Sequence, residues 1–324
     1  MRTLTVALLL PLGLFACGHG GESADAGPAD AGPYIAGFDP APVAAGYTRY
    51  ITPVVQIPPS SSNSWCQYVA APLAADTDVT SVTGQQSTFG HHIVLYATTA
   101  NAPVGTSRLC TTGDMLSVRY LGAIGGEGTG SLSHVLPPGV VFRAHQGESL
   151  MLNTHFLNTS DAAALGQGVL DVEFAPPSSS AQVAGFFTNL NTTFDLAPGN
   201  SSPQVADARC VVQQDFQLFA FADHMHGLGS SAFTEVIDAD GGTTPMVTDP
   251  AWSPELMFNP TFATWPTSAP MTVHSGETIH THCEWINDGT TAVTFPTEMC
   301  VGLGFFLPGT GAEINCINGQ WPKG

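Results

Sequence analysis

The stretch SLMLNTHF at residues 149–156 has the composition of a β-strand. The stretches HIVLY at residues 92–96 and QLFAF at residues 217–221 have the same character, and Gly, Pro, Asn or Asp residues flank all three. No window of 12 or more residues shows a persuasive apolar stripe with the 3.6-residue period of a helix. The chain is therefore predicted to be all-β.

Composition supports this fold class and excludes some functions. The 324 residues include 35 Gly and 25 Pro, which favours strands joined by turns. With 43% hydrophobic residues the chain can bury a core, so it is not expected to be disordered. Its 7 Lys and Arg against 26 Asp and Glu give a net charge of −19, which excludes nucleic acid as a partner.

The length allows about two domains. A segment rich in Pro and Ser at residues 175–180 is the best candidate for a linker. It divides the body into residues 38–178 and 182–318, each of the size of an antiparallel β-sandwich. We expect two jelly-roll-like sandwiches.

The first 17 residues have the pattern of an export signal. A cationic start and an apolar run precede LFAC at residues 14–17, which resembles the bacterial lipobox and predicts lipidation of Cys17. A secreted protein whose signal ends near a cysteine is the alternative. The small and acidic residues of 18–37 predict a flexible tether. Because Gly18 is not Asp, we expect the outer membrane or cell surface of a Gram-negative bacterium, with membrane contact through the lipid alone.

Six cysteines remain after Cys17, and an even number in an exported chain predicts disulfides without specifying their pairing. They are Cys66, Cys110, Cys210, Cys283, Cys300 and Cys316.

The histidines are clustered in both halves. His224 and His226 would share one face of a strand and could bind one ion, with Met299 as a softer third ligand that favours Cu(I). The adjacent His91 and His92 would face opposite sides, so both can reach one metal only at a strand end or a bulge, or by using unlike ring nitrogens. His155 could complete that site.

Four motifs occur in the order found in a known family. Together they resemble the copper type II, ascorbate-dependent monooxygenases, which include the peptidylglycine α-hydroxylating and dopamine β-monooxygenases. The motifs are GHHIVLY at 90–96, NTHFLN at 153–158, HMHGLG at 224–229 and TEMC at 297–300.

The resemblance implies two copper ions per chain in a metal-lined cleft between the two sandwiches, and hydroxylation of a C–H bond with O2 and a one-electron donor such as ascorbate. It implies that the electron-donating copper is held by His91, His92 and His155, and that the oxygen-binding copper is held by His224, His226 and Met299. It also implies three disulfides: Cys66–Cys110, Cys210–Cys316 and Cys283–Cys300.

Two positions depart from the amidating branch of that family. Ala222 stands where that branch has an arginine for a peptide carboxylate, and Ala97 stands where it has a cysteine. The only basic side chain from residue 210 onward is Lys323. We therefore expect a small neutral or cationic substrate. Asp223 and Glu298 adjoin ligands and either orient them or, by strand alternation, face solvent.

Other interpretations remain open. A second His-x-His, at His280 and His282, competes with the site at His224 and His226 or binds an additional metal. His134 and His145 are expected in loops or on the surface, and His19 lies in the tether. The chain could instead be a non-catalytic protein for copper binding or electron relay, or an adhesin with structural histidines.

Overall fold

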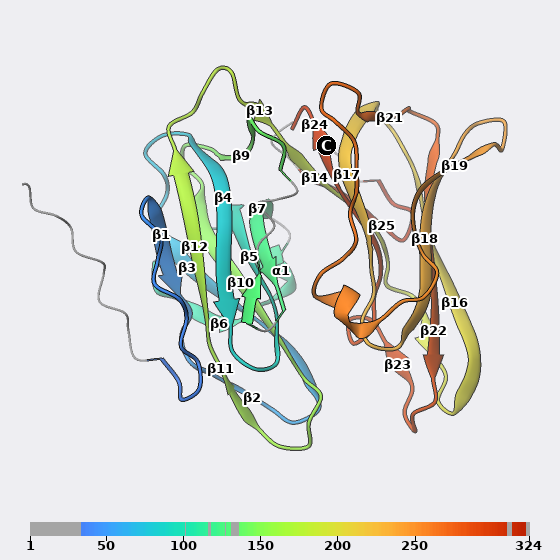
Figure 1. Cartoon of the computed structure of the whole chain (residues 1–324), viewed down its shortest axis with the longest axis horizontal. Helices are drawn as coiled ribbons and strands as arrows, with labels where there is room; N and C mark the ends of the chain where they lie inside the picture. Colours follow the sequence, from blue (N-terminus) through green and yellow to red (C-terminus); the bar gives the residue numbers. More distant parts are fainter. Residues whose placement is uncertain are drawn as a thin grey trace, which may run out of the picture. The chain divides into compact units, whose positions relative to one another are not determined.

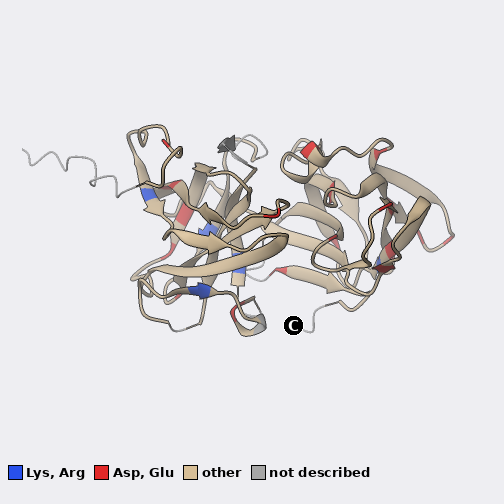
Figure 2. Ribbon diagram, turned by 90° about the horizontal axis from the view of Figure 1, so that it is seen from below, with Lys and Arg blue, Asp and Glu red and all other residues tan. Residues whose placement is uncertain are grey.

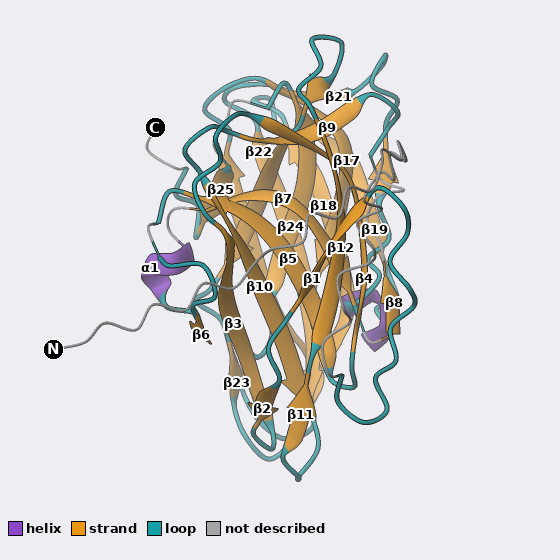
Figure 3. Cartoon of the chain, turned by 90° about the vertical axis from the view of Figure 1, so that its left-hand side faces the viewer, coloured by secondary structure: helices purple, strands orange, loops and turns teal. Residues whose placement is uncertain are grey.

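The structure is a computed structural model that describes residues 34–100, 102–115, 118–126, 128–130, 136–309 and 313–321. The predicted export signal, Cys17, His19 and His134 lie outside these residues, as does the tether up to residue 33. Strands dominate the described chain, as Figure 3 shows, and the all-β prediction is confirmed. No described helix has the length and apolar character needed to cross a membrane.

The first half forms two sheets, drawn in blue to green in Figure 1. One sheet contains, in spatial order, β1 (Tyr47–Ile51), β12 (Gly168–Ala175), β4 (Thr77–Gln86), β9 (Val140–Ala144) and β13 (Gln182–Val183), with β8 (Gly128–Gly130) paired to β4. The other contains β6 (Ser107–Leu109), β3 (Ser61–Ala70), β10 (Ser149–Asn158), β5 (Gly90–Thr98) and β7 (Val118–Gly125). A ribbon of β2 (Val55–Ile57) with β11 (Ala164–Gly166) and the short helix α1 (Thr112–Met115) complete this half.

The second half repeats this plan. One sheet contains, in spatial order, β20 (Ala263–Thr264), β17 (Phe216–His224), β24 (Cys300–Leu307), β14 (Gly185–Asn191) and β25 (Ile314–Ile317), with β21 (Met271–Val273) paired to β17. The other contains β16 (Asn200–Val211), β22 (Thr278–Asn287), β18 (Gly229–Ile237) and β19 (Thr243–Asp249). A ribbon of β15 (Asp195–Leu196) with β23 (Val293–Thr294) and a 3-10 turn at Pro254–Met257 lie outside these sheets.

The boundary between the halves needs one correction. The sequence assigned Gln182 and Val183 to the second sandwich, but they pair in parallel with Val140 and Val141 of β9. The chain therefore leaves the first half after β13 and enters the second at Gly185, the first residue of β14. Nothing in the local sequence marks this two-residue extension, because its partners lie about 40 residues earlier in the chain.

The hydrophobic core crosses this boundary. One buried cluster joins apolar residues of β4, β5, β7 and β9 to Phe219, Phe305 and Leu307 of the second half. The Tyr120 ring on β7 stacks on the Phe186 ring with centroids 4.5 Å apart, and its centroid lies 5.6 Å from that of Phe305. A second cluster fills the space between the sheets of the second half. The halves therefore share buried aromatic surface.

The three disulfides of the structure are those that the resemblance implied. They join Cys66 to Cys110, Cys210 to Cys316 and Cys283 to Cys300. The last of these anchors the first residue of β24 to the centre of β22.

Candidate metal centre

A β-bulge brings His91, His92 and His155 together. His155 on β10 pairs with His92 on β5, and the next pair joins Phe156 to Gly90, which leaves His91 as the extra residue of the bulge. A bulge re-aims a side chain that would otherwise face away. The ring centroids of His91 and His155 lie 4.8 Å apart, and those of His92 and His155 lie 5.0 Å apart. Each residue offers one ring nitrogen, and these three atoms lie within 4.8 Å of one another.

A second group contains His91, His224 and His226. His224 is the last residue of β17, and His226 lies in the loop that follows. Ring nitrogens of these three residues also lie within 4.8 Å of one another, and the His91 centroid is 4.8 Å from that of His226. The sequence assigned His91 to the first-half site alone. The structure instead places it within reach of both sets, so the two predicted sites are contiguous.

Met299 lines the same cavity as three of these rings, and its neighbours in the chain fix its backbone. The Glu298 carboxylate accepts the backbone N–H groups of His226, at 2.9 Å, and of Leu228, at 2.7 Å. Met299 then precedes Cys300, which the disulfide to Cys283 fixes. Met299, His91, His92 and His224 all line one cavity.

Hydrogen bonds leave one nitrogen of several rings free for a metal. Nδ1 of His226 donates to the carbonyl oxygen of Thr297 at 2.9 Å, which leaves Nε2 with a free lone pair. This Nε2 atom is buried and has no partner among the described residues. Asn153 Oδ1 lies 3.2 Å from Nε2 of His92, and Ser62 Oγ lies 2.8 Å from Nε2 of His155. Such bonds orient metal-binding imidazoles.

His91 has a different environment. Both of its ring nitrogens are buried, and neither has a hydrogen-bond partner within the described residues. A buried polar atom without a partner costs about 1–3 kcal/mol, so two on one ring need an explanation. A metal ion is the partner that both groups of histidines suggest.

The five rings are kept neutral. Burial is the main cause of their lowered pKa values. The pKa of His92 falls to about 4, and the pKa values of His91, His155 and His224 fall well below the usual range. Burial also lowers the pKa of His226, against the opposing hydrogen bond to Thr297. Neutral imidazole is the form that binds a metal ion, so these residues fit a transition-metal ion such as zinc, copper, iron or nickel.

The cavity beside the histidines has a volume of about 930 Å³ and is lined by both halves of the chain. Its walls are mainly apolar, with phenylalanine rings that include Phe258, Phe262 and Phe305. Such a volume suits a small organic molecule.

Charged side chains also line the cavity. Arg119 forms a two-pronged ion pair with Glu148, with N–O distances of 2.9 and 2.5 Å. Glu313 accepts the backbone N–H of Tyr120 and a side-chain N–H of Asn315, and burial raises its pKa to about 7. The sequence argument found no cation for this site because it considered only the second half. Arg119 supplies one, but Glu148 neutralises it.

This pattern extends to the other arginines of the first half. Figure 2 shows acidic residues over both halves and few basic ones. Arg49, Arg108 and Arg143 pair with Asp171, Asp114 and Asp78 respectively. Arg119 is the one Lys or Arg among the described residues that line the cavity, and it is paired with Glu148. This pairing disfavours a carboxylate ligand.

The expectation that Asp223 and Glu298 could face solvent is wrong. Both are buried, at 1% and 2% exposure. The bonds of Glu298 to the His226 loop and to Trp285 Nε1, at 3.0 Å, give it a positioning role. Asp223 accepts the hydroxyl hydrogen of Thr234 inside the second sandwich. For Asp223, strand alternation failed because both faces of β17 are covered, whereas Glu298 lies in the loop before β24 and not on a strand.

The remaining histidines lie in other groups. His280 and His282 form a separate group with Asp207 and so do not replace His224 and His226. His145 is 41% exposed and lies 3.4 Å from Asp76, as expected for a surface residue.

Comparisons with known proteins give only distant structural neighbours. No protein-family model and no curated protein matches the chain. The major capsid protein P2 of bacteriophage PM2 aligns over 80% of this chain and 97% of its own, with 8% identity and a TM-score of 0.38. PBCV-1 VP54, fitted into a reconstruction of the virophage Sputnik, aligns over 80% and 94%, with 8% identity and a TM-score of 0.30. Vicilin from tomato, Solanum lycopersicum, aligns over 81% and 75%, with 9% identity and a TM-score of 0.14.

Proposed function

We propose that this protein is a copper-dependent monooxygenase that hydroxylates a C–H bond of a small neutral or cationic organic substrate. The observation that carries the proposal is the pair of histidine groups that share His91, in which three rings are buried and two half-buried, next to a cavity that His91, His92, His224 and Met299 line. The resemblance to the copper type II, ascorbate-dependent monooxygenases, stated above from four motifs, supplies the reaction class. His91, His92 and His155 would hold one copper, and His224, His226 and Met299 the other.

When bound, the two copper ions would each supply one electron from a donor such as ascorbate, so that one atom of O2 enters the C–H bond and the other leaves as water. The chain contributes position and electronic tuning. Asn153 and Ser62 orient two of the rings, and Glu298 fixes the loop that carries His226. The Met299 thioether would favour the reduced state of its metal.

The cavity accounts for the substrate class. Phenylalanine rings would bury the apolar body of the substrate next to the histidines, and water would be excluded from that end. A carboxylate would find Arg119 already paired with Glu148. Glu313 would instead accept a hydrogen bond from a polar or cationic group.

We also propose that the chain is exported and anchored through Cys17. The three disulfides support an oxidising compartment, where such bonds persist.

The proposal is tested by oxygen consumption coupled to product formation. The protein would be loaded with copper, reduced with ascorbate and screened with small aromatic and amine compounds under ¹⁸O₂. We expect copper-dependent transfer of one ¹⁸O atom to a substrate, with loss of transfer in H226A and retention in the matched surface variant H145A. Copper binding without transfer to any compound would indicate electron relay or copper capture instead. Less than one bound copper per chain would overturn both interpretations.

A further inference from the structure

We propose that Asp207, His280 and His282 form a separate binding site for a divalent transition-metal ion such as Zn²⁺, on the face of the second sandwich that points away from its core. This site is independent of the proposed function, because no residue of the cavity takes part in it.

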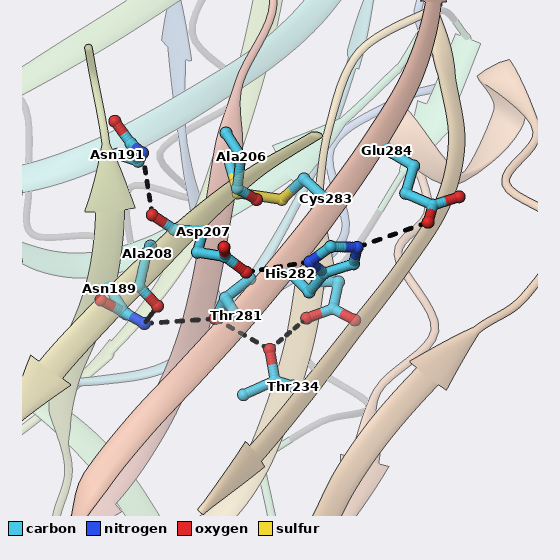
Figure 4. The surroundings of a disulfide bond; sticks show 12 residues. Asn189, Asn191, Ala206, Asp207, Ala208, Thr234, Thr281, His282, Cys283 and Glu284 are labelled. Carbon is cyan, nitrogen blue, oxygen red and sulfur yellow. Dashed lines mark hydrogen bonds and ion pairs between the residues drawn. A yellow bond between two sulfur atoms is a disulfide. The ribbon is translucent and has the colours of Figure 1, made fainter. Parts of the chain in front are cut away.

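The sheet positions these three side chains rigidly. β22 is a central strand between β16 and β18, and its residues Ile279, Thr281 and Cys283 are buried in the interior. His280 and His282 therefore project from the opposite face. Asp207 on β16 is the register partner of His282. Figure 4 shows Asp207, His282 and Glu284 around the Cys283 disulfide.

The donor atoms already converge. Oδ1 of Asp207 lies 2.7 Å from Nε2 of His280 and 2.9 Å from Nδ1 of His282. Ligand atoms on a tetrahedral zinc ion, with bonds of about 2.0–2.1 Å, are separated by roughly 3.3 Å. Asp207 is 41% exposed, so its side chain can move by the few tenths of an ångström that this requires.

The opposite nitrogen of each ring also faces a carboxylate. Nδ1 of His280 lies 3.1 Å from Oε1 of Glu235, and Nε2 of His282 lies 3.4 Å from Oε1 of Glu284. A neutral imidazole has one N–H and so can donate to only one of its two carboxylate neighbours. A metal ion at Asp207 would satisfy both nitrogens of each neutral ring, because each ring then binds the ion through one nitrogen and donates from the other. Carboxylates that accept from metal-bound imidazoles are typical of zinc sites.

The donor set distinguishes this site from the cavity. Two imidazoles and one carboxylate suit Zn²⁺ and related divalent ions, and the exposed carboxylate leaves room for water at the remaining position. Three carboxylates gathered around two histidines also favour a dication on charge. Bound there, the ion would join β16 to β22 next to the Cys283–Cys300 disulfide.

Zinc titration and anomalous diffraction test the site. The copper-loaded protein would be titrated with ZnCl₂ by calorimetry, and zinc-soaked crystals would be measured above and below the zinc edge. We expect one further zinc per chain and an anomalous peak between Asp207, His280 and His282. D207A and H282A should each weaken this binding at least tenfold. H274A removes a solitary exposed histidine, 3.2 Å from Asp215, and should leave it unchanged.

Two results would overturn the site. One is zinc-soaked wild-type crystals without a peak at these residues. The other is unchanged zinc affinity in both D207A and H282A. Copper content would be measured in each variant, because retained copper shows that the fold is intact. The position of the zinc peak does not depend on turnover, so failure of the monooxygenase proposal and failure of this site are separate results.

Discussion

Met299 is the side chain on which the proposed oxygen chemistry depends most. It lines the same cavity as His91, His92 and His224, and its neighbours on both sides are fixed, Glu298 by hydrogen bonds and Cys300 by a disulfide. A thioether selects for Cu(I), whereas imidazole alone serves several metals. In the proposed function the sulfur atom would therefore select for reduced copper.

Replacing Met299 by Ile keeps an apolar side chain of similar size but removes sulfur. We expect M299I to lose turnover by at least two orders of magnitude, while the His91, His92 and His155 group still binds copper. Product formation and copper content measured on the same sample check this. Hydroxylation at the wild-type rate in M299I would contradict the assignment.

The motifs were sufficient to propose the five histidines and Met299 as ligands, because each motif is local in sequence, whereas the pairing of the cysteines came from the family resemblance. Arg119, Glu148 and Glu313 carry no such signal. They line the cavity only because the two halves pack together, with Glu313 nearly 200 residues from its Tyr120 partner. The position of His91 between both groups was also beyond the sequence, since it depends on the same packing.

Glu313 gives a prediction about pH. Its pKa is raised to about 7 in the folded protein by burial, from an ordinary value of 4.5. Between these values the unfolded chain has released the proton while the folded protein keeps it. The contribution of Glu313 to the free energy of unfolding is therefore fully present below pH 4.5 and is lost as pH rises to about 7.

E313Q lacks this dependence. The free energy of unfolding of E313Q minus that of the wild type should increase from pH 4.5 to 7, by at most about 1.4 kcal/mol per pH unit. Urea denaturation of the metal-free proteins at four pH values measures it. A constant difference between the two proteins over this range would show that Glu313 ionises normally.

At the scale of elements, the start of β5 decides where two of the histidines point. The bulge opposite His155 and Phe156 places His91 and His92 on the same site, and Gly90 precedes them in close contact with the preceding turn. A Cβ atom at Gly90 would lie 2.3 Å from Cβ of Gln86. An added Cβ atom would therefore displace the backbone of the bulge.

G90A should therefore destabilise the protein by about 1–3 kcal/mol, as overpacked sites do, and weaken copper binding. The matched control is G113A in α1, where the nearest atom to an added Cβ is the Thr111 hydroxyl at 3.7 Å. Thermal unfolding and copper titration of both variants measure the effect. Wild-type copper affinity in G90A would show that the bulge does not depend on this glycine.

The sequence predicted the strands because apolar residues flanked by turn residues are local signals, and it suggested two sandwiches from the Pro- and Ser-rich segment at residues 175–180. It allowed a bulge at His91 and His92 without deciding for it, since a bulge depends on the partner strand. The parallel pairing of β13 with β9 was not predicted, because two residues carry no recognisable pattern.

At the scale of the whole body, the halves share one buried aromatic cluster. Phe305 is 1% exposed, and its ring lies within 6.0 Å, between centroids, of rings from both halves, including Tyr120, Phe142 and Phe219. Since these contacts join the sandwiches, we expect both to unfold in one transition. The same packing closes the cavity wall beside Phe305.

F305A should lower the free energy of unfolding by about 3–5 kcal/mol, as large core truncations do, and separate the transition into two. L109A, at a position that is 53% exposed, is the control and should change stability by less than about 0.5 kcal/mol. Calorimetry of the metal-free proteins distinguishes one transition from two. If wild type itself unfolds in two steps, the halves are not coupled as described.

The most direct test of the account is X-ray absorption at the copper edge on the reduced protein, together with its copper content. The account predicts two copper ions per chain with imidazole ligands, and a sulfur neighbour that disappears in M299I. Fewer than one copper per chain, or a spectrum without sulfur that M299I leaves unchanged, would contradict it.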